Sequence, residues 1–398
     1  MALAPQTFGF MIPAYSLMGV GCSSEIGAQA KALGATNILL VTDIVLNKLG
    51  MADKIKAQLV EAGMKVTIFD GAEPNPKDTN VVAGLKIYKD NKCDGIVTLG
   101  GGSSHDCGKG IGLVATNGGK ISDYEGFGLV PKPMPPLIAV NTTAGTGSEL
   151  SGGAVITNTA AKVKMAIIDR HAVPTVAIND PLLMVGMPPA LTAATGMDAL
   201  THAVEGYVAI LATPLTDCLD IKAIELIGEY LPAAVANGQN VVARDKMAYA
   251  EYLAGSTMCN AGLGLVHAMA HQLGGFYNLP HGVCNAILLP VVCEFNMIAC
   301  TQRFADVAVA LGENITGLST VEAGAKAVAA IRKLSKDIGI PANLSELGVV
   351  KESDFETLAK NALKDVCAVF NPRLATLKEV VGMYQTALGA PLAKAAAK

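Results

Sequence analysis

The first half of the chain alternates short apolar runs with segments of helical spacing, and this alternation limits the fold more than any other feature. Runs typical of buried strands lie at residues 38–43, 65–70, 95–102 and from 137 onwards. Apolar residues recur at helical spacing at 53–64, 80–91 and 107–117. Apolar strands joined by helices favour a parallel sheet covered on both faces. We therefore predict a doubly wound, Rossmann-like α/β domain over residues 1–185.

The second half of the chain has a different pattern of apolar residues. Strand patterns almost vanish beyond about residue 186, where Ala- and Leu-rich windows with helical periodicity take over. A chain of 398 residues also exceeds a typical single domain. We therefore predict an all-helical second domain over residues 186–398.

Composition excludes several classes of function. The net charge is −4 and the chain has no long basic run, so we expect no nucleic-acid partner. No uninterrupted apolar stretch has the roughly 18 to 20 residues of a membrane span, and the first residues lack the basic and apolar regions of a signal peptide. The nine cysteines include no CxxC pair, which is typical of reduced thiols. We expect a cytoplasmic protein.

Two polar loops follow predicted strands in the first domain. The glycine-rich stretch at 100–110 leads into a helix, where backbone N–H groups can bind a phosphate; its alternative is a plain tight turn. The stretch at 141–149 is rich in Thr and Gly and suits a ribose or an amide, or is only a surface loop. Asp43 ends the predicted strand at 38–43. If it binds the adenosine ribose it favours NAD over NADP; otherwise it is a solvated side chain.

Acidic and histidine side chains cluster in the second half at helical spacing. Asp198 and His202 are four residues apart, as are His267 and His271, and His281 follows in a Pro-His-Gly turn. Asp198 could instead belong to a capping box, and a lone core histidine is commonly only hydrogen-bonded. Two such pairs in an apolar region are costly to bury without a cation. Carboxylate and imidazole ligands without a thiolate suit Fe(II), Zn(II) or another borderline divalent ion.

These motifs together resemble the iron-containing (group III) alcohol dehydrogenases, and within them the NAD-dependent methanol and 1,3-propanediol dehydrogenases. The resemblance covers essentially the whole chain, including the late segment DVCAVFNPR. It departs at Met258 and Cys259, where relatives usually have Phe and Asn, and at Gly152 and Gly153, where bulkier residues are usual. We expect both departures near the substrate pocket or its support.

The resemblance also implies roles for individual residues. It makes Asp198, His202, His267 and His281 the metal ligands, and it places His271 beside the metal near the nicotinamide, as a proton relay. The positions that contact the cofactor in the family correspond here to Asp43, Gly101, Gly102, Ser103, Asp106, Thr142, Thr143, Ser148 and Lys164.

The implied activity is reversible hydride transfer between NAD and short-chain primary alcohols, of the methanol, ethanol and 1,3-propanediol class. Fe(II) is the expected ion, with Zn(II) or another divalent ion as alternatives. The nearest enzymatic alternatives are glycerol dehydrogenase and 3-dehydroquinate synthase, which share this architecture; the alternative outside enzymes is an NAD- and metal-binding sensor. We also expect a homo-oligomer, a dimer or larger, up to a decamer.

Overall fold

The computed structural model describes residues 7–161 and 163–389. Within these residues the chain forms two compact units, one over Gly9–Gly186 and the other from Met187 onwards. The division after Gly186 lies one residue from the boundary expected between residues 185 and 186.

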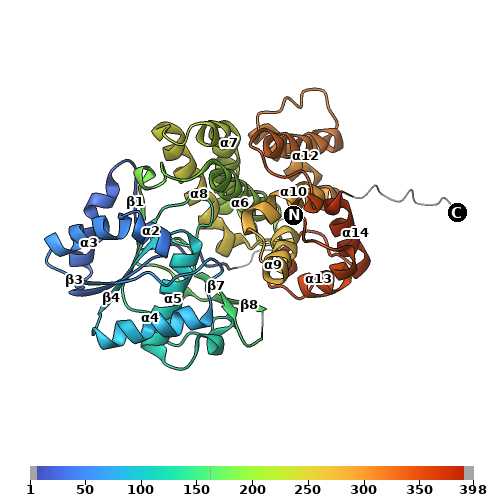
Figure 1. The fold of residues 1–398 in the computed structure, drawn as a ribbon. Coiled ribbons are helices and arrows are strands. Elements are labelled where there is room, and N and C mark those ends of the chain that lie inside the picture. Colours follow the sequence, from blue (N-terminus) through green and yellow to red (C-terminus); the bar gives the residue numbers. More distant parts are fainter. Residues whose placement is uncertain (1–6, 162, 390–398) are drawn as a thin grey trace. The chain divides into compact units, whose positions relative to one another are not determined.

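The first unit is built on a six-stranded parallel sheet (Figure 1). Its strands are β1 (Tyr15–Met18), β2 (Asn37–Val41), β3 (Lys65–Phe69), β4 (Gly95–Gly100), β6 (Leu137–Asn141) and β9 (Val176–Asn179). Their order across the sheet is β1-β9-β6-β4-β2-β3, and every pairing is parallel. The chain moves outward from β2 to β3 and then returns to β4 on the other side of β2. The topological switch point, where such sheets bind ligands, therefore lies between β2 and β4.

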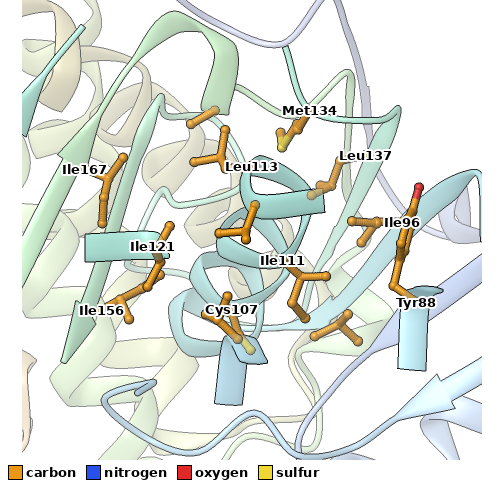
Figure 2. Packing of buried hydrophobic residues seen from close by; sticks show 14 of the residues in the cluster. Tyr88, Ile96, Cys107, Ile111, Leu113, Ile121, Met134, Leu137, Ile156 and Ile167 are labelled. Atoms are coloured by element: carbon orange, nitrogen blue, oxygen red, sulfur yellow. The ribbon is translucent and has the colours of Figure 1, made fainter. Parts of the chain in front are cut away.

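Helices cover both faces of this sheet. They are α1 (Ile26–Ala32), α2 (Ile44–Lys48), α3 (Met51–Glu61), α4 (Asp78–Asp90) and α5 (Gly102–Asn117). Alternate residues of β2 belong to different cores: Leu39 packs in one with α4 and α5, and Leu40 in the other with α1 and α3. Figure 2 shows the first core, where Cys107 and Ile111 of α5 lie among strand residues. The doubly wound sheet expected from the sequence is confirmed.

A second, three-stranded sheet in this unit was not predicted. It consists of β5 (Gly126–Phe127), β8 (Val163–Ile168) and β7 (Gly153–Asn158), in that order, with β7 and β8 antiparallel. Its apolar side chains Ile156, Met165 and Ile167 are buried in the same core as α5. Strand β5 has only two residues, and both β5 and β7 begin at a glycine, which weakens the strand pattern in the sequence.

The second unit is helical throughout its described residues. Its main helices are α6 (Pro189–Val208), α7 (Pro214–Ala236), α8 (Val241–Ala261), α9 (Leu265–Tyr277), α10 (His281–Asn296), α11 (Thr301–Ala310), α12 (Thr320–Asp337), α13 (Phe355–Ala362) and α14 (Leu377–Leu388). Residues 281–299 are long and apolar enough for a membrane span by composition alone, but 61% of that window is buried inside the protein, as in a core helix. Helix α6 packs against α7, α8 and α10 and is buried almost all round, so its polar side chains are buried with it.

Candidate functional site

Three helices of the second unit bring the predicted metal ligands together. Helix α6 provides Asp198 and His202, α9 provides His267 and His271, and α10 begins at His281. Asp198, His202 and His267 are each less than 5% exposed, whereas the His281 side chain is 29% exposed. The cluster is thus enclosed, with one side chain reaching partly to solvent.

Ligand atoms of Asp198, His267 and His281 converge. All three lie within 4.8 Å of one another, with Asp198 Oδ1 3.9 Å from His267 Nε2 and 3.6 Å from His281 Nε2. An ion held by bonds of about 2.0–2.2 Å keeps its ligand atoms roughly 3–4 Å apart. The spacing and the donor types therefore fit a divalent ion.

His202 lies beside this group and is not one of the three converging residues. Its ring stacks on that of His267, with centroids 4.7 Å apart and planes inclined by 16°. The structure thus brings His202 against the cluster, and its role as a fourth ligand stays a prediction.

Asn285, which the sequence analysis missed, lies at the point where the three ligand atoms meet. Its Nδ2 is 2.6 Å from Asp198 Oδ1 and 3.1 Å from Nε2 of both His267 and His281, while its Oδ1 is buried without a hydrogen-bond partner. The NH₂ group of Asn285 carries a partial positive charge and lies among the three ligand atoms, as a bound cation would. Its spacing of four residues from His281 on α10 was the one available sequence indication.

Glu205, one turn beyond His202 on α6, is a second residue that was missed. Its Oε2 accepts a hydrogen bond from His267 Nδ1 at 2.6 Å, so the lone pair of that ring is left on Nε2. Burial lowers the pKa of His267 well below its usual value, and His202 lowers it further, which keeps the imidazole neutral. Burial also raises the pKa of Glu205 to about 7. A neutral, oriented imidazole is what a metal ligand requires.

His271 is paired with a carboxylate from the late DVCAVFNPR segment. Its Nδ1 lies 2.9 Å from Asp365 Oδ2, and its ring stacks on that of His281 with centroids 5.4 Å apart. Burial acts to raise the pKa of Asp365, but His271 and the N–H of Cys367 together hold it below its usual value. The ionised carboxylate therefore fixes which ring nitrogen of His271 carries hydrogen.

The glycine loop of the first unit opens α5 at the switch point of the sheet. Gly101 is the N-cap of α5 and has no side-chain cap, so the first N–H groups of this helix are not bound by a capping side chain. A Cβ on Gly101 would lie 2.8 Å from Thr143 Oγ1, and one on Gly102 would lie 3.2 Å from Thr146. The glycines therefore also let the loop at 141–149 pack closely against this turn.

The remaining predicted cofactor residues come from several elements of the same unit. Asp43 follows β2 and caps α2, where its Oδ1 accepts from the N–H groups of Val45 and Leu46 at 2.8 and 3.0 Å. Ser103 lies in the first turn of α5, Thr142 and Thr143 follow β6, and Lys164 is on β8 opposite Thr157. The strand ends at Val41, so Asp43 is a helix cap rather than the last residue of the strand as expected.

Asp106 and Ser148 join the two loops. Ser148 Oγ donates to Asp106 Oδ1 at 2.6 Å, and the N–H of Val155 donates to the other carboxylate oxygen at 3.0 Å. The fully buried Lys109, a residue that was missed, donates from Nζ to Ser148 Oγ and to the carbonyl of Gly153 at 3.2 and 2.6 Å. Its position in an apolar helical run was the only sequence indication of this role.

The comparisons with known proteins agree with this geometry. Residues 13–181 match the family described as iron-containing alcohol dehydrogenase, and residues 192–388 match the C-terminal part of the Fe-containing alcohol dehydrogenase family. The chain belongs to the iron-containing alcohol dehydrogenase family. The resemblance and the alcohol dehydrogenase function that it implied are thereby confirmed.

Curated relatives of the dehydrogenase are similar over nearly their whole length. The NAD-dependent methanol dehydrogenase of Bacillus methanolicus is 52% identical over 95% of this chain and 99% of its own. The 1,3-propanediol dehydrogenase of Klebsiella pneumoniae is 53% identical over 96% of this chain and 99% of its own. The crystal structure of a 1,3-propanediol oxidoreductase has a TM-score of 0.95 at 53% identity and covers 96% of this chain and 100% of that one.

The residues that we expect to depart from the family pattern have partly structural explanations. A Cβ on Gly152 would lie 2.5 Å from the carbonyl oxygen of Asp169, so packing against the backbone requires glycine there. Met258 and Cys259 lie in the last turn of α8 and are partly buried. Their expected place near the substrate pocket stays a prediction.

Proposed function

We propose that the chain is an NAD-linked, metal-dependent dehydrogenase that interconverts short-chain primary alcohols and aldehydes. The observation that carries this proposal is the convergence of ligand atoms from Asp198, His267 and His281 inside a helical unit. Membership of the iron-containing family and the substrates named in its relatives, methanol and 1,3-propanediol, support the same reaction class.

Asp198, His202, His267 and His281 would hold one divalent ion, for which Fe(II) is the first candidate and Zn(II) or another divalent ion the alternative. When bound, the ion supplies a Lewis acid for the substrate oxygen.

His271 would move the proton of the alcohol. With Nδ1–H donated to Asp365, the Nε2 of this ring has a lone pair that accepts a proton, and the carboxylate stabilises the resulting charge. His271 would therefore act as the general base for alcohol oxidation and the general acid for aldehyde reduction.

NAD, which supplies hydride chemistry through its nicotinamide ring, would bind at the switch point of the sheet. The uncapped N-terminus of α5 at Gly101, Gly102 and Ser103 suits the pyrophosphate, since its N–H groups and dipole favour an anion. Asp43 would bind the adenosine ribose. The other proposed cofactor contacts are Asp106, Thr142, Thr143, Ser148 and Lys164.

We further propose a cytoplasmic homo-oligomer, a dimer or larger, up to a decamer. The cysteines are all free within the described residues, which suits a reducing compartment. Light scattering of the purified protein measures the subunit number directly.

The decisive experiment follows NADH formation by metal-reconstituted enzyme with methanol, ethanol, 1,3-propanediol and glycerol. We expect turnover of the primary alcohols, and His267→Ala should lose both metal and activity while still binding NAD. Full activity after chelator treatment would refute the proposed mechanism, and a preference for glycerol would support the glycerol dehydrogenase alternative.

A further inference from the structure

Glu205 connects two features of α9 that the proposed function leaves separate. It lies on α6 in the same stripe as Asp198 and His202, at spacings of four and then three residues, and it is only 3% exposed. Both of its carboxylate oxygens contact α9, which begins at Leu265. A buried carboxylate needs such partners, because its burial is otherwise very costly.

One of these contacts replaces the missing cap of α9. The N-cap residue Gly264 has no capping side chain, and the N–H of Val266 donates to Glu205 Oε1 at 2.6 Å. A Cβ on Gly264 would lie only 2.7 Å from the same oxygen, so glycine is required for the carboxylate to approach. Asn371 Oδ1 accepts the neighbouring N–H of Leu265 at 3.2 Å. The N-terminus of α9 is therefore capped from outside the helix.

The other contact reaches the proposed metal ligand. Glu205 Oε2 accepts from the ring Nδ1 of His267 at 2.6 Å and lies 3.4 Å from its backbone nitrogen, which also donates to it. One carboxylate thus holds both the backbone and the ring of His267. The opposite edge of the ring, Nε2, lies 3.9 Å from Asp198 Oδ1.

We propose that Glu205 is the positioning residue of the metal site: by capping α9 and accepting from His267 Nδ1, it fixes the tautomer and direction of this ligand. The proposal deepens the proposed function and rests on the metal site described there. Only a carboxylate fits this role, because it accepts at both oxygens. An amide would turn its NH₂ towards either Val266 N–H or His267 Nδ1, and the second choice places hydrogen on Nε2.

The test compares Zn²⁺ affinity of the metal-stripped full chain and its variants, by competition with a chelator of known affinity. Glu205→Gln should bind Zn²⁺ about 10- to 100-fold more weakly, as is typical when a carboxylate behind a ligating histidine is lost. Asp220→Asn is the control for replacing a buried carboxylate elsewhere in the unit, since Asp220 accepts from Thr257 and not from any histidine. It should bind Zn²⁺ like the wild type.

Asn371→Ala is the matched control for the helix cap, because it removes the acceptor of Leu265 N–H without touching His267. It should lower thermal stability and leave Zn²⁺ affinity within a few-fold of wild type. A loss of Zn²⁺ affinity in Asn371→Ala as large as that in Glu205→Gln would overturn the proposal. Loosening of the N-terminus of α9 would then explain the loss in both variants. Equal Zn²⁺ affinity of Glu205→Gln and wild type would overturn it as well.

Nitrogen NMR of histidine-labelled wild type provides a readout that does not depend on a variant folding. His267 should carry hydrogen on Nδ1 in the metal-free protein, and a ring with hydrogen on Nε2 would refute the assignment. If His267→Ala bound Zn²⁺ as tightly as wild type, both the proposed metal site and the proposed role of Glu205 would be refuted. Loss of Zn²⁺ binding in His267→Ala but not in Glu205→Gln would refute the positioning role of Glu205 and leave the proposed metal site standing.

Discussion

The start of α10 leaves no space for a side chain at Gly282, the residue after His281. A Cβ at this position would lie 2.2 Å from the carbonyl oxygen of Ala194 on α6 and 2.8 Å from its carbonyl carbon. Both neighbours are backbone atoms, which cannot rotate away as a side chain would. In Gly282→Ala, α6 and α10 must therefore separate by roughly 1 Å to regain ordinary contact.

That displacement has two measurable consequences. Overpacking of this kind costs about 1–3 kcal/mol of stability, which lowers Tm by about 2–4 °C for each kcal/mol in a unit of this size. It also moves His281 away from Asp198, whose ligand atoms now lie 3.6 Å apart. Metal–ligand distances tolerate about 0.2 Å, so we expect Zn²⁺ affinity to fall by at least about tenfold, as for other disturbed ligand supports.

The matched control is Gly275→Ala on α9, where an added Cβ would meet no heavy atom within 4 Å. Alanine is favoured over glycine in a helix by about 0.5–1 kcal/mol, so this variant should be slightly more stable and bind metal normally. Differential scanning calorimetry and chelator competition measure both quantities. Wild-type Tm and Zn²⁺ affinity in Gly282→Ala would refute the idea that close approach of α6 and α10 sets the ligand spacing.

Three further predictions concern other groups. Asp43→Ser keeps a cap acceptor for α2 but removes a charge, and steady-state kinetics should show the ratio of kcat/KM for NADP to that for NAD rise roughly tenfold; an unchanged ratio would mean that Asp43 only caps the helix. His271→Gln should retain metal, measured by atomic absorption, while kcat falls about 100-fold; metal loss would make it a ligand instead. Burial raises the pKa of Asp220 well above its usual value, so its protonated form stabilises the fold at low pH and this contribution is lost as pH rises through the raised pKa. The stability of Asp220→Asn relative to wild type should therefore increase with pH in urea titrations, and a flat difference would show that Asp220 does not titrate in this way.

The sequence predicted the first unit well where one local rule decides the structure. Strands β2, β4 and β6 are apolar runs buried on both faces, so composition alone identifies them. Helix α5 begins at Gly102, within the glycine-rich stretch that was predicted to lead into a helix; the apolar helical spacing starts only near residue 107, because the first turn is glycine and serine. The β7–β8 pair was missed because it depends on burial against α5, a contact distant in sequence.

The sequence indicated which candidate site residues lie together where they are neighbours on one helix, and it did not indicate the residues that support them from a distance. The pairs Asp198/His202 and His267/His271 follow from a spacing of four residues. Their supports do not: Glu205 reaches His267 across 62 residues, and Asp365 reaches His271 across 94. Periodicity carries no information about such contacts, since they depend on which helices pack together.

Helix α6 explains why these supports are needed. It is enclosed by α7, α8 and α10, and a helix buried in this way would be more stable with apolar side chains than with Asp198, His202 and Glu205. Each carboxylate instead contacts a group on another helix, Asp198 through Asn285 of α10 and Glu205 through the N-terminus of α9. The polar stripe therefore couples the packing of three helices to the direction of the ligands. We therefore expect any change that shifts one of these helices to alter the proposed metal site, even if it touches none of the proposed ligands.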